Sequence, residues 1–360
     1  MNKIKVGIIG ATGYAGVELV RLLTLHPYAE ITALSSVSYE GKKLSEIYPN
    51  LKKIADYELE NADAVVEKCD VIFAAVPHGL SEPIAEQCLE KGKLLIDIGA
   101  DFRMYDEAAY SEWYKRPYSH PELHKYAKYC LPELYRDEVK KAKIIGNPGC
   151  YPTSIALACA PALKNGLVKT EGIIIDSKSG VTGAGRSLTQ GTHYPDTNEA
   201  FSAYKAGEHR HTPEIEQTLS DIAGSEVKVT FVPHLLPVNR GIESTVYMNL
   251  MDGVTKEQVI QAYENAYKDE LFVRMEPAGS YANIKNVRMS NYCDISLHFD
   301  MRNNRLIVCS VIDNMVKGAA GQAIQNMNIY FGFDEGTALM MPPQEFSAGN
   351  APGGERPAAK

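Results

Sequence analysis

The sequence predicts an α/β protein with two domains, an N-terminal doubly wound parallel sheet and an α+β domain with a largely antiparallel sheet. Three observations support this fold class. A chain of 360 residues exceeds what one ordinary core accommodates. Up to about residue 145, apolar strand-like runs alternate with helical runs, as in a parallel sheet. Beyond Cys150 the strand-like runs are no longer regularly separated by helices.

Composition restricts the classes of function. Apolar residues make up 45% of the chain and charged residues 23%, which is typical of a soluble globular enzyme. The net charge of −8 provides no basic surface for nucleic acid. An N-terminal run after Lys3 and Lys5 imitates a signal peptide, but Gly7, Gly10 and Glu18 interrupt it. No apolar run approaches the ~20 residues of a membrane span.

The cysteines indicate the compartment. The seven cysteines are odd in number, and no pair has metal-ligand spacing or suggests a disulfide framework. We therefore expect a cytoplasmic protein that binds no metal. With no signal for nucleic acid or a membrane, the expected partner is a small-molecule substrate.

The first elements predict a dinucleotide site in a Rossmann-type domain. A buried strand at 5–9 precedes a glycine-rich turn at 10–16, GATGYAG, and a helix at 17–23. Glycines in this context permit a tight turn and a close approach of pyrophosphate to the helix N-terminus. The spacing is GxxGxxG rather than GxGxxG, and a purely structural turn is the alternative. The predicted cofactor contacts are Gly10, Thr12, Gly13, Tyr14, Ala15 and Gly16.

The end of the second strand predicts the type of cofactor. The strand at 30–34 is followed by Ser35 and Ser36, where an NAD site usually has a carboxylate for the ribose 2′-hydroxyl. Lys42 and Lys43 follow shortly after. Hydroxyls and ammonium groups suit a 2′-phosphate, so we predict NADP(H), with Ser35 and Ser36 as contacts. In the alternative interpretation the lysines are only a solvated surface.

The remaining strands of the first domain are expected at 70–75, 93–97 and 142–145, with a helix at 81–90. Ligands bind beyond the C-terminal ends of such strands. Arg103 lies in one of these loops and could hold a phosphate or carboxylate. The alternative is an ordinary salt bridge with Asp101 or Asp106.

The motif at 147–151, NPGCY, lies between a strand-like run and an apolar helical run. A cysteine at this junction faces the positive end of a helix dipole, which favours the thiolate. We predict that Cys150 is a nucleophile. The alternative, equally weighted on this stretch alone, is a small buried apolar residue.

The second half contains strand-like runs at 173–176, 228–232, 244–248, 293–298 and 306–311, and the last two flank a hairpin signal at 302–304. A second glycine-rich loop at 180–186 contains Gly183, whose backbone could approach a nicotinamide. The proline-containing segment 231–241 is interpreted as a rigid structural loop. A final helix at 315–331 is rich in small residues and is expected to pack on the first domain beside the cofactor.

Two histidines precede a predicted helix. Thr212 and Pro213 resemble an N-cap and a first helical residue, so His209 and His211 lie just before the helix begins. The dipole there disfavours imidazolium and predicts a neutral ring near pH 7. A surface anion site is the alternative.

These motifs together resemble the N-acetyl-gamma-glutamyl-phosphate reductase family, NADPH-dependent enzymes of arginine biosynthesis within the semialdehyde dehydrogenase superfamily. The resemblance runs over nearly the whole chain, and its most specific parts are GNPGCYPT at 146–153 and HRHTPE at 209–214. It implies residues 1–149 as the NADP-binding domain, completed by 315–331, and residues 150–314 as the catalytic and oligomerisation domain. The tail at 342–360, rich in Gly, Pro and Ala, is expected to be disordered.

The resemblance also implies a mechanism. Cys150 would attack the acyl phosphate to form a thioester, and His209 would be the acid/base residue. The implied substrate contacts are Arg103, Asn147 and His211, and Asn314 would lie near the nicotinamide. The family further implies a homodimer or homotetramer. Two alternatives remain open: reduction of aspartyl or aminoadipyl phosphate, and a noncatalytic NADP-binding sensor.

Overall fold

The computed structural model describes residues 3–344 and divides into two compact units. The first contains the chain up to Cys150 together with Thr182–Thr189 and Met315–Met341. The second contains Tyr151–Val181 and Gln190–Asn314. Of the tail expected to be disordered, residues 345–360 lie outside the described residues.

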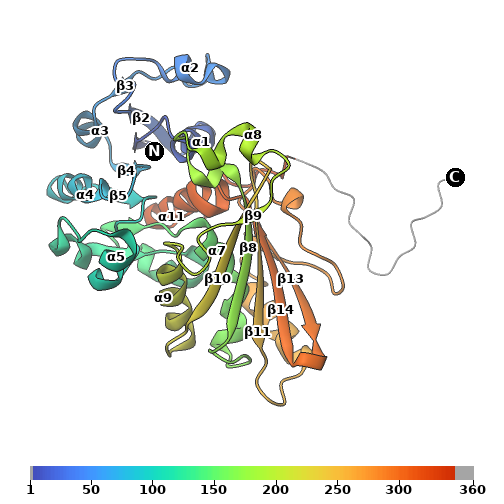
Figure 1. Ribbon diagram of the computed structural model, residues 1–360. Coiled ribbons are helices and arrows are strands. Elements are labelled where there is room, and N and C mark those ends of the chain that lie inside the picture. Colours follow the sequence, from blue (N-terminus) through green and yellow to red (C-terminus); the bar gives the residue numbers. More distant parts are fainter. Residues whose placement is uncertain (1–2, 345–360) are drawn as a thin grey trace. The chain divides into compact units, whose positions relative to one another are not determined.

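The first unit is built on a parallel sheet, as predicted (Figure 1). Its order, β3-β2-β1-β4-β5-β7-β6, reverses direction at β1, so the loop after β1 lies at the switch point where ligands bind in doubly wound sheets. The alternating apolar runs explain the fold because strands buried on both faces must be apolar throughout. The strands are β1 Ile4–Ile9, β2 Ala29–Ser35, β3 Leu59–Glu60, β4 Val71–Ala74, β5 Leu94–Asp97, β6 Ala127–Tyr129 and β7 Ile144–Gly146.

Helices connect these strands. Helix α4 has the predicted bounds, whereas α1 begins earlier than predicted because Gly13, not Gly16, is its N-cap. Side chains cap two helices that the sequence analysis did not specify, Asn61 at α3 and Asp106 at α5. The helices are α1 Tyr14–Leu23, α2 Leu44–Ile47, α3 Ala62–Lys68, α4 Ser81–Glu90, α5 Glu107–Tyr114, α6 Pro132–Val139 and α11 Gly321–Phe331.

The final helix differs from the prediction in its first turn. The segment Val316–Ala320 is π-helical and leads into α11. π-Helical turns arise where the regular hydrogen-bond ladder is interrupted. The segment is anchored on α6 by a buried ion pair between Lys317 and Glu133, with 2.5 Å between Nζ and Oε1.

The second unit contains a mixed sheet of order β12-β13-β14-β11-β8-β10-β9 (Figure 1). Four pairings are antiparallel and two, β8 with β10 and β12 with β13, are parallel, which confirms the largely antiparallel prediction. The strands are β8 Ile173–Gly180, β9 Ser202–Ala203, β10 Val229–Leu236, β11 Ile242–Asn249, β12 Val273–Met275, β13 Cys293–Asp300 and β14 Arg305–Ile312.

Two helices of this unit are tied together by tyrosines. The hydroxyl of Tyr263 donates to the carbonyl of Ala158 at 2.5 Å, and that of Tyr267 donates to Leu157, so α10 is fixed against α7. A capping box between Thr255 and Gln258 begins α10. The helices are α7 Cys150–Lys164, α8 Tyr194–Thr197, α9 Thr212–Ala223 and α10 Lys256–Tyr267.

The interpretation of 231–241 as a loop was wrong for its first half. Strand β10 continues through Pro233 to Leu236. A proline is tolerated in β10 because β9, its neighbour at the edge of the sheet, spans only two residues. The missing N–H of Pro233 therefore costs few hydrogen bonds between strands.

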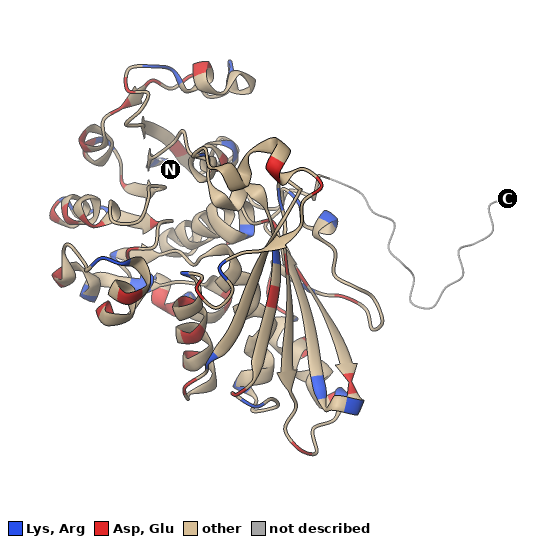
Figure 2. Cartoon of the chain, viewed as in Figure 1, with Lys and Arg blue, Asp and Glu red and all other residues tan. Residues whose placement is uncertain are grey.

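Charged residues lie mainly on helices and loops, with both signs interspersed (Figure 2). None of the helices in residues 3–344 is long and apolar enough to cross a membrane.

Candidate active site

The glycine-rich loop leaves no room for side chains at two positions. Gly10 has a φ of +87°, and a Cβ there would lie 2.3 Å from the carbonyl oxygen of Ala75. A Cβ on Gly16 would lie 2.2 Å from the carbonyl oxygen of Gly10. A side chain at Gly10 or Gly16 would therefore collide with the backbone of the loop or of the segment after β4. This close packing is the geometry that brings a helix N-terminus near a pyrophosphate.

The N-terminus of α1 is suited to an anion. Its N-cap, Gly13, provides no side-chain acceptor, and the first turn contains no acidic residue. The loop itself is held by hydrogen bonds from the N–H groups of Gly10 and Ala11 to the carbonyl of Ser35, at 3.0 and 2.9 Å. Unsatisfied N–H groups at a helix start, with the dipole behind them, bind phosphate.

The end of β2 contains hydroxyls, as the sequence shows, but they are already engaged. Ser35 and Ser36 are only 2% and 4% exposed. The Oγ of Ser36 lies 2.8 Å from Oγ1 of Thr12 in a buried hydroxyl pair. These side chains therefore link β2 to the glycine loop and have little surface left for a ligand.

The structure adds three residues that the sequence analysis missed. Nη1 of Arg186 and the hydroxyl of Tyr48 both donate to the carbonyl of Thr12, each at 2.9 Å. The Arg186 guanidinium also lies over the rings of Tyr39 and Tyr48. Arg186 ends the second glycine-rich loop, so that motif was the available signal. Gly183 lies in the same segment, Thr182–Thr189, which belongs to the first unit.

The loop before Cys150 is fixed from both sides within the first unit. A Cβ on Gly146 would lie 2.1 Å from the carbonyl oxygen of Phe102, so β7 ends directly against the Arg103 loop. The backbone carbonyl of Asn147 accepts a hydrogen bond from Nε of Arg103 at 2.9 Å. The backbone N–H of Asn147 donates to the backbone carbonyl of Asp97, also at 2.9 Å. Arg103 is only 7% exposed, and its Nη2 also donates a hydrogen bond to the backbone carbonyl of Ile98.

The side chain of Asn147 is fully buried and engaged at both ends. Its Nδ2 donates to the carbonyl of Ala319 in the π-helical turn at 3.2 Å, and its Oδ1 accepts from Nδ2 of Asn326 at 3.1 Å. Nδ2 of Asn326 also donates to the carbonyl of Cys130 at 2.9 Å. The C-terminal segment thus holds the strand and loop that lead to Cys150.

Asp101 and Asp106, the acidic residues near Arg103 in the sequence, hold neighbouring backbone groups in place. Asp101 accepts hydrogen bonds from the N–H groups of Gly79 and Ser81 and from the hydroxyl of Tyr110. Asp106 accepts from the first turn of α5. Burial, reinforced by the Asp101 charge, raises the pKa of Asp97. This acidic pair holds together the loops that follow β4 and β5.

Cys150 is the first residue of α7, which extends for 15 residues. It is partly exposed, as is Cys309, whereas the other five cysteines are buried. Burial raises the pKa of the Cys309 thiol to about 11, and it likewise raises the pKa of Cys69, Cys88, Cys130 and Cys159. Cys150 therefore combines solvent access with the positive end of a helix dipole.

His209 lies in an aromatic environment of the second unit. Its ring centroid is 5.5 Å from that of Tyr151, the residue after Cys150, and 5.5 Å from Phe231. Tyr204 and His211 complete the surroundings at 5.6 and 4.8 Å. Helix α9 has His211, not Thr212, as its N-cap, so the predicted helix start was one residue late.

The electrostatics of His209 favour the neutral ring. Burial lowers the pKa of His209 to about 4, with smaller contributions from Lys205 and Arg210. Burial thus favours the neutral ring near pH 7, the state expected from the sequence. Nδ1 accepts a hydrogen bond from the N–H of His211 at 3.0 Å, which places the ring proton on Nε2.

The remaining predicted residues occupy separate places. Oδ1 of Asn314, a buried residue of the second unit, accepts from the N–H of Gly241 at 2.8 Å. No group of three or more metal-ligating side chains occurs within residues 3–344.

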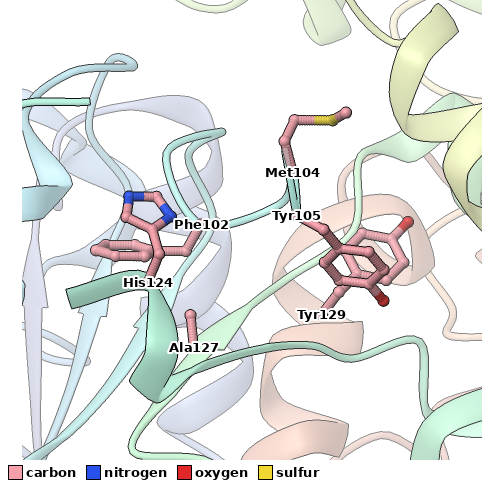
Figure 3. Close-up of a pocket in the computed structure, with 6 residues that line it drawn as sticks. All are labelled: Phe102, Met104, Tyr105, His124, Ala127 and Tyr129. Carbon is pink, nitrogen blue, oxygen red and sulfur yellow. The ribbon is translucent and has the colours of Figure 1, made fainter. Parts of the chain in front are cut away.

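A small pocket in the first unit, shown in Figure 3, is lined by Phe102, Met104, Tyr105, His124, Ala127 and Tyr129. None of the predicted site residues lines it.

Comparison with known proteins identifies the family. Residues 5–142 match the family model described as semialdehyde dehydrogenase, NAD binding domain, and residues 150–314 match semialdehyde dehydrogenase, dimerisation domain. The N-acetyl-gamma-glutamyl-phosphate reductase of Clostridium beijerinckii is 56% identical over 336 residues, covering 93% of this chain and 98% of that protein. The enzyme of the same name from Brachyspira hyodysenteriae is 56% identical over 351 residues, covering 95% and 100%.

Solved structures share the fold at lower identity. Aspartate semialdehyde dehydrogenase II from Vibrio cholerae has a TM-score of 0.72 and 17% identity, covering 92% of this chain and 99% of that one. The aspartate semialdehyde dehydrogenase with NADP from Candida albicans has a TM-score of 0.67 and 18% identity, covering 91% and 98%. With the identity to the reductases, these matches show that the chain belongs to the N-acetyl-gamma-glutamyl-phosphate reductase family of semialdehyde dehydrogenases.

Proposed function

We propose that this protein uses NADPH to reduce N-acetyl-L-glutamyl 5-phosphate to N-acetyl-L-glutamate 5-semialdehyde and phosphate, a step of arginine biosynthesis. The names of the curated relatives support the substrate and the reaction. The observation that carries the proposal is the placement of Cys150, a partly exposed thiol at the first residue of α7. The other cysteines are buried or have a raised pKa.

Cys150 carries the covalent step. Its thiolate, favoured by the dipole of α7, attacks the acyl carbon of the substrate. A C–S bond forms, the C–O bond to phosphate breaks, and phosphate leaves with the electron pair. The product is a thioester on Cys150. When the semialdehyde is released, the C–S bond breaks and its electron pair restores the thiolate.

The first unit fits an NADP cofactor. When bound, the cofactor supplies a hydride to the thioester carbon. The glycine loop and the N-terminus of α1 would hold its pyrophosphate, because Gly10 and Gly16 have no side chains to keep the phosphates away from the backbone N–H groups. The adenosine would lie beyond β2, where Ser35 replaces the carboxylate of NAD sites. Gly183 and Asn314 are proposed as neighbours of the nicotinamide.

His209 acts as a hydrogen-bond donor in this proposal. With Nδ1 occupied by the His211 N–H, the neutral ring presents Nε2–H, which would stabilise negative charge on the substrate carbonyl oxygen. This refines the expected acid/base role, since a ring in this state gives a hydrogen bond rather than taking the thiol proton. The contact of His209 with Tyr151, the chain neighbour of Cys150, supports a role beside the nucleophile.

Arg103 and Asn147 are proposed to position the Cys150 loop. Asn147 is fully buried and its amide is engaged with Ala319 and Asn326, which argues against the direct substrate contact expected from the sequence. Arg103 holds the Asn147 carbonyl. His211 remains the proposed contact for a substrate anion.

The reverse reaction tests the substrate. Purified protein is mixed with NADP, phosphate and either N-acetylglutamate semialdehyde or aspartate semialdehyde, and NADPH absorbance is followed. We expect phosphate-dependent NADPH formation with the acetylated substrate and at least about 100-fold lower kcat/KM with aspartate semialdehyde, whose chain is shorter and unacetylated. Activity with aspartate semialdehyde alone would keep the mechanism and contradict the substrate. Inactivity of folded, NADP-binding protein towards both would favour the noncatalytic sensor.

We also propose a homodimer or homotetramer, assembled through the second unit in the cytoplasm. The match of residues 150–314 to a dimerisation domain supports the assembly, and seven free cysteines suit a reducing compartment. Light scattering coupled to size-exclusion chromatography should give a mass of two or four chains of 39.6 kDa. A monomer at micromolar concentration would contradict this assembly.

A further inference from the structure

A cluster of two aromatic rings and two cations lies beside the glycine loop of the first unit. The guanidinium carbon of Arg186 is 5.5 Å from the ring centroid of Tyr39 and 5.4 Å from that of Tyr48. Nζ of Lys42 is 6.0 Å from the Tyr39 centroid. Cation–π contacts of this kind hold a guanidinium in one place while leaving its N–H groups available.

Neither cation has an acidic partner within residues 3–344. The hydrogen bond that Arg186 makes runs from Nη1 to a neutral acceptor, the carbonyl of Thr12. A guanidinium has five N–H donors, so most of its capacity is unused. Arg186 and Lys42 are both exposed, and no carboxylate in these residues is within ion-pair distance of either. Two exposed cations without a counter-ion form a ready site for an anion.

The cluster lies where the adenosine part of a dinucleotide is expected. Thr12 accepts from both Arg186 and Tyr48 through its carbonyl, and its hydroxyl pairs with Ser36 at the end of β2. In a doubly wound domain, the ribose 2′ position lies at the end of this second strand. The cluster is therefore fixed to the loop that receives the pyrophosphate and to the strand that receives the ribose.

The serines alone do not explain a preference for a phosphate at that position. Ser35 and Ser36 are almost completely buried, and Ser36 already pairs with Thr12. Two hydroxyls also provide no positive charge to balance a phosphate. The nearby cations supply what the hydroxyls lack.

We propose that Arg186 recognises the 2′-phosphate of NADP(H), with Lys42 in support, and that Tyr39 and Tyr48 hold the guanidinium in position. The inference rests on the proposed cofactor and deepens it, because it transfers the main recognition of the 2′-phosphate from the serines to an arginine 150 positions further along the chain. Guanidinium groups bind phosphate through paired N–H donors, which a lysine does not reproduce.

Nucleotide fragments isolate this contact from catalysis. Isothermal titration calorimetry with 2′,5′-ADP and 5′-AMP measures the 2′-phosphate contribution without substrate or turnover. For Arg186→Met we expect 2′,5′-ADP affinity to fall roughly 10- to 100-fold and 5′-AMP affinity to change by less than about threefold. Arg186→Lys should show an intermediate loss, and Lys42→Met a smaller one. Arg302→Met, an exposed arginine on the β13–β14 hairpin, is the matched control and should behave as wild type.

The outcomes separate this inference from the proposed function. Equal losses for both nucleotides, or none for Arg186→Met, would overturn the assignment of Arg186 while leaving an NADP-dependent enzyme intact. Wild-type protein that binds 5′-AMP as tightly as 2′,5′-ADP would overturn both the inference and the NADP preference. Thermal unfolding of each variant checks that the exposed substitutions leave the fold unchanged.

Discussion

Replacing Cys150 by alanine is expected to lower kcat by about 10⁴-fold or more in both directions of the reaction. Without the sulfur no thioester can form, and no other described cysteine combines access with a favoured thiolate. The dissociation constant for NADPH should stay within about twofold of wild type, because the glycine loop is formed by other residues. Steady-state kinetics and calorimetric titration measure the two effects separately.

Cys309→Ala is the matched control. Cys309 is also partly exposed, but its thiol has a pKa of about 11, so it should be neither reactive nor catalytic. Alkylation at neutral pH should label Cys150 first and should slow when substrate is present. An inert Cys150 thiol together with retained turnover in Cys150→Ala would exclude the covalent mechanism and favour the sensor.

Replacing His209 by alanine is expected to lower kcat by roughly 10²- to 10³-fold, the usual loss for one donor to a developing oxyanion. His209→Gln keeps a neutral N–H donor and should recover part of that loss. A general base would show no such recovery, since an amide cannot take a proton. His193→Gln, at a largely exposed histidine beside Asp196, is the control and should retain wild-type kcat.

The lowered pKa of His209 also predicts the pH dependence of stability. The folded ring titrates at about 4, whereas an unfolded histidine titrates near 6.5. Above pH 6.5 both states are neutral and the group contributes no pH dependence. As the pH falls from 6.5 to 4, the unfolded chain gains a proton that the folded ring resists, so stability decreases. Denaturant unfolding of His209→Gln should therefore vary less with pH in this window than wild type; identical curves would contradict the shift.

Local sequence patterns were sufficient for most of the fold. Apolar runs located the central parallel strands, and helix α4 was predicted with its observed bounds, with Pro83 in its first turn as the signal. The glycine loop was recognisable because Gly10 and Gly16 meet steric demands that only glycine satisfies. The capping box of α10 was an available signal that the sequence analysis did not use.

Features that depend on distant parts of the chain were not predictable in this way. Strand β10 continues through Pro233 because its outer neighbour is short, and Arg186 joins a site formed by residues 12–48. Asn147 was expected at the substrate, but its amide meets a π-helical turn over 160 residues later in the chain. Each of these depends on tertiary contacts that no local pattern encodes.

Trapping the acyl-enzyme tests the central claim most directly. Protein is mixed with N-acetylglutamate semialdehyde and NADP without phosphate, and NADPH formation is followed together with the intact mass. The mechanism predicts a single burst of one NADPH per chain, an acyl group mapped to the peptide containing Cys150, and turnover once phosphate is added. Steady NADPH formation without phosphate, or a burst with no acyl group on Cys150, would contradict it.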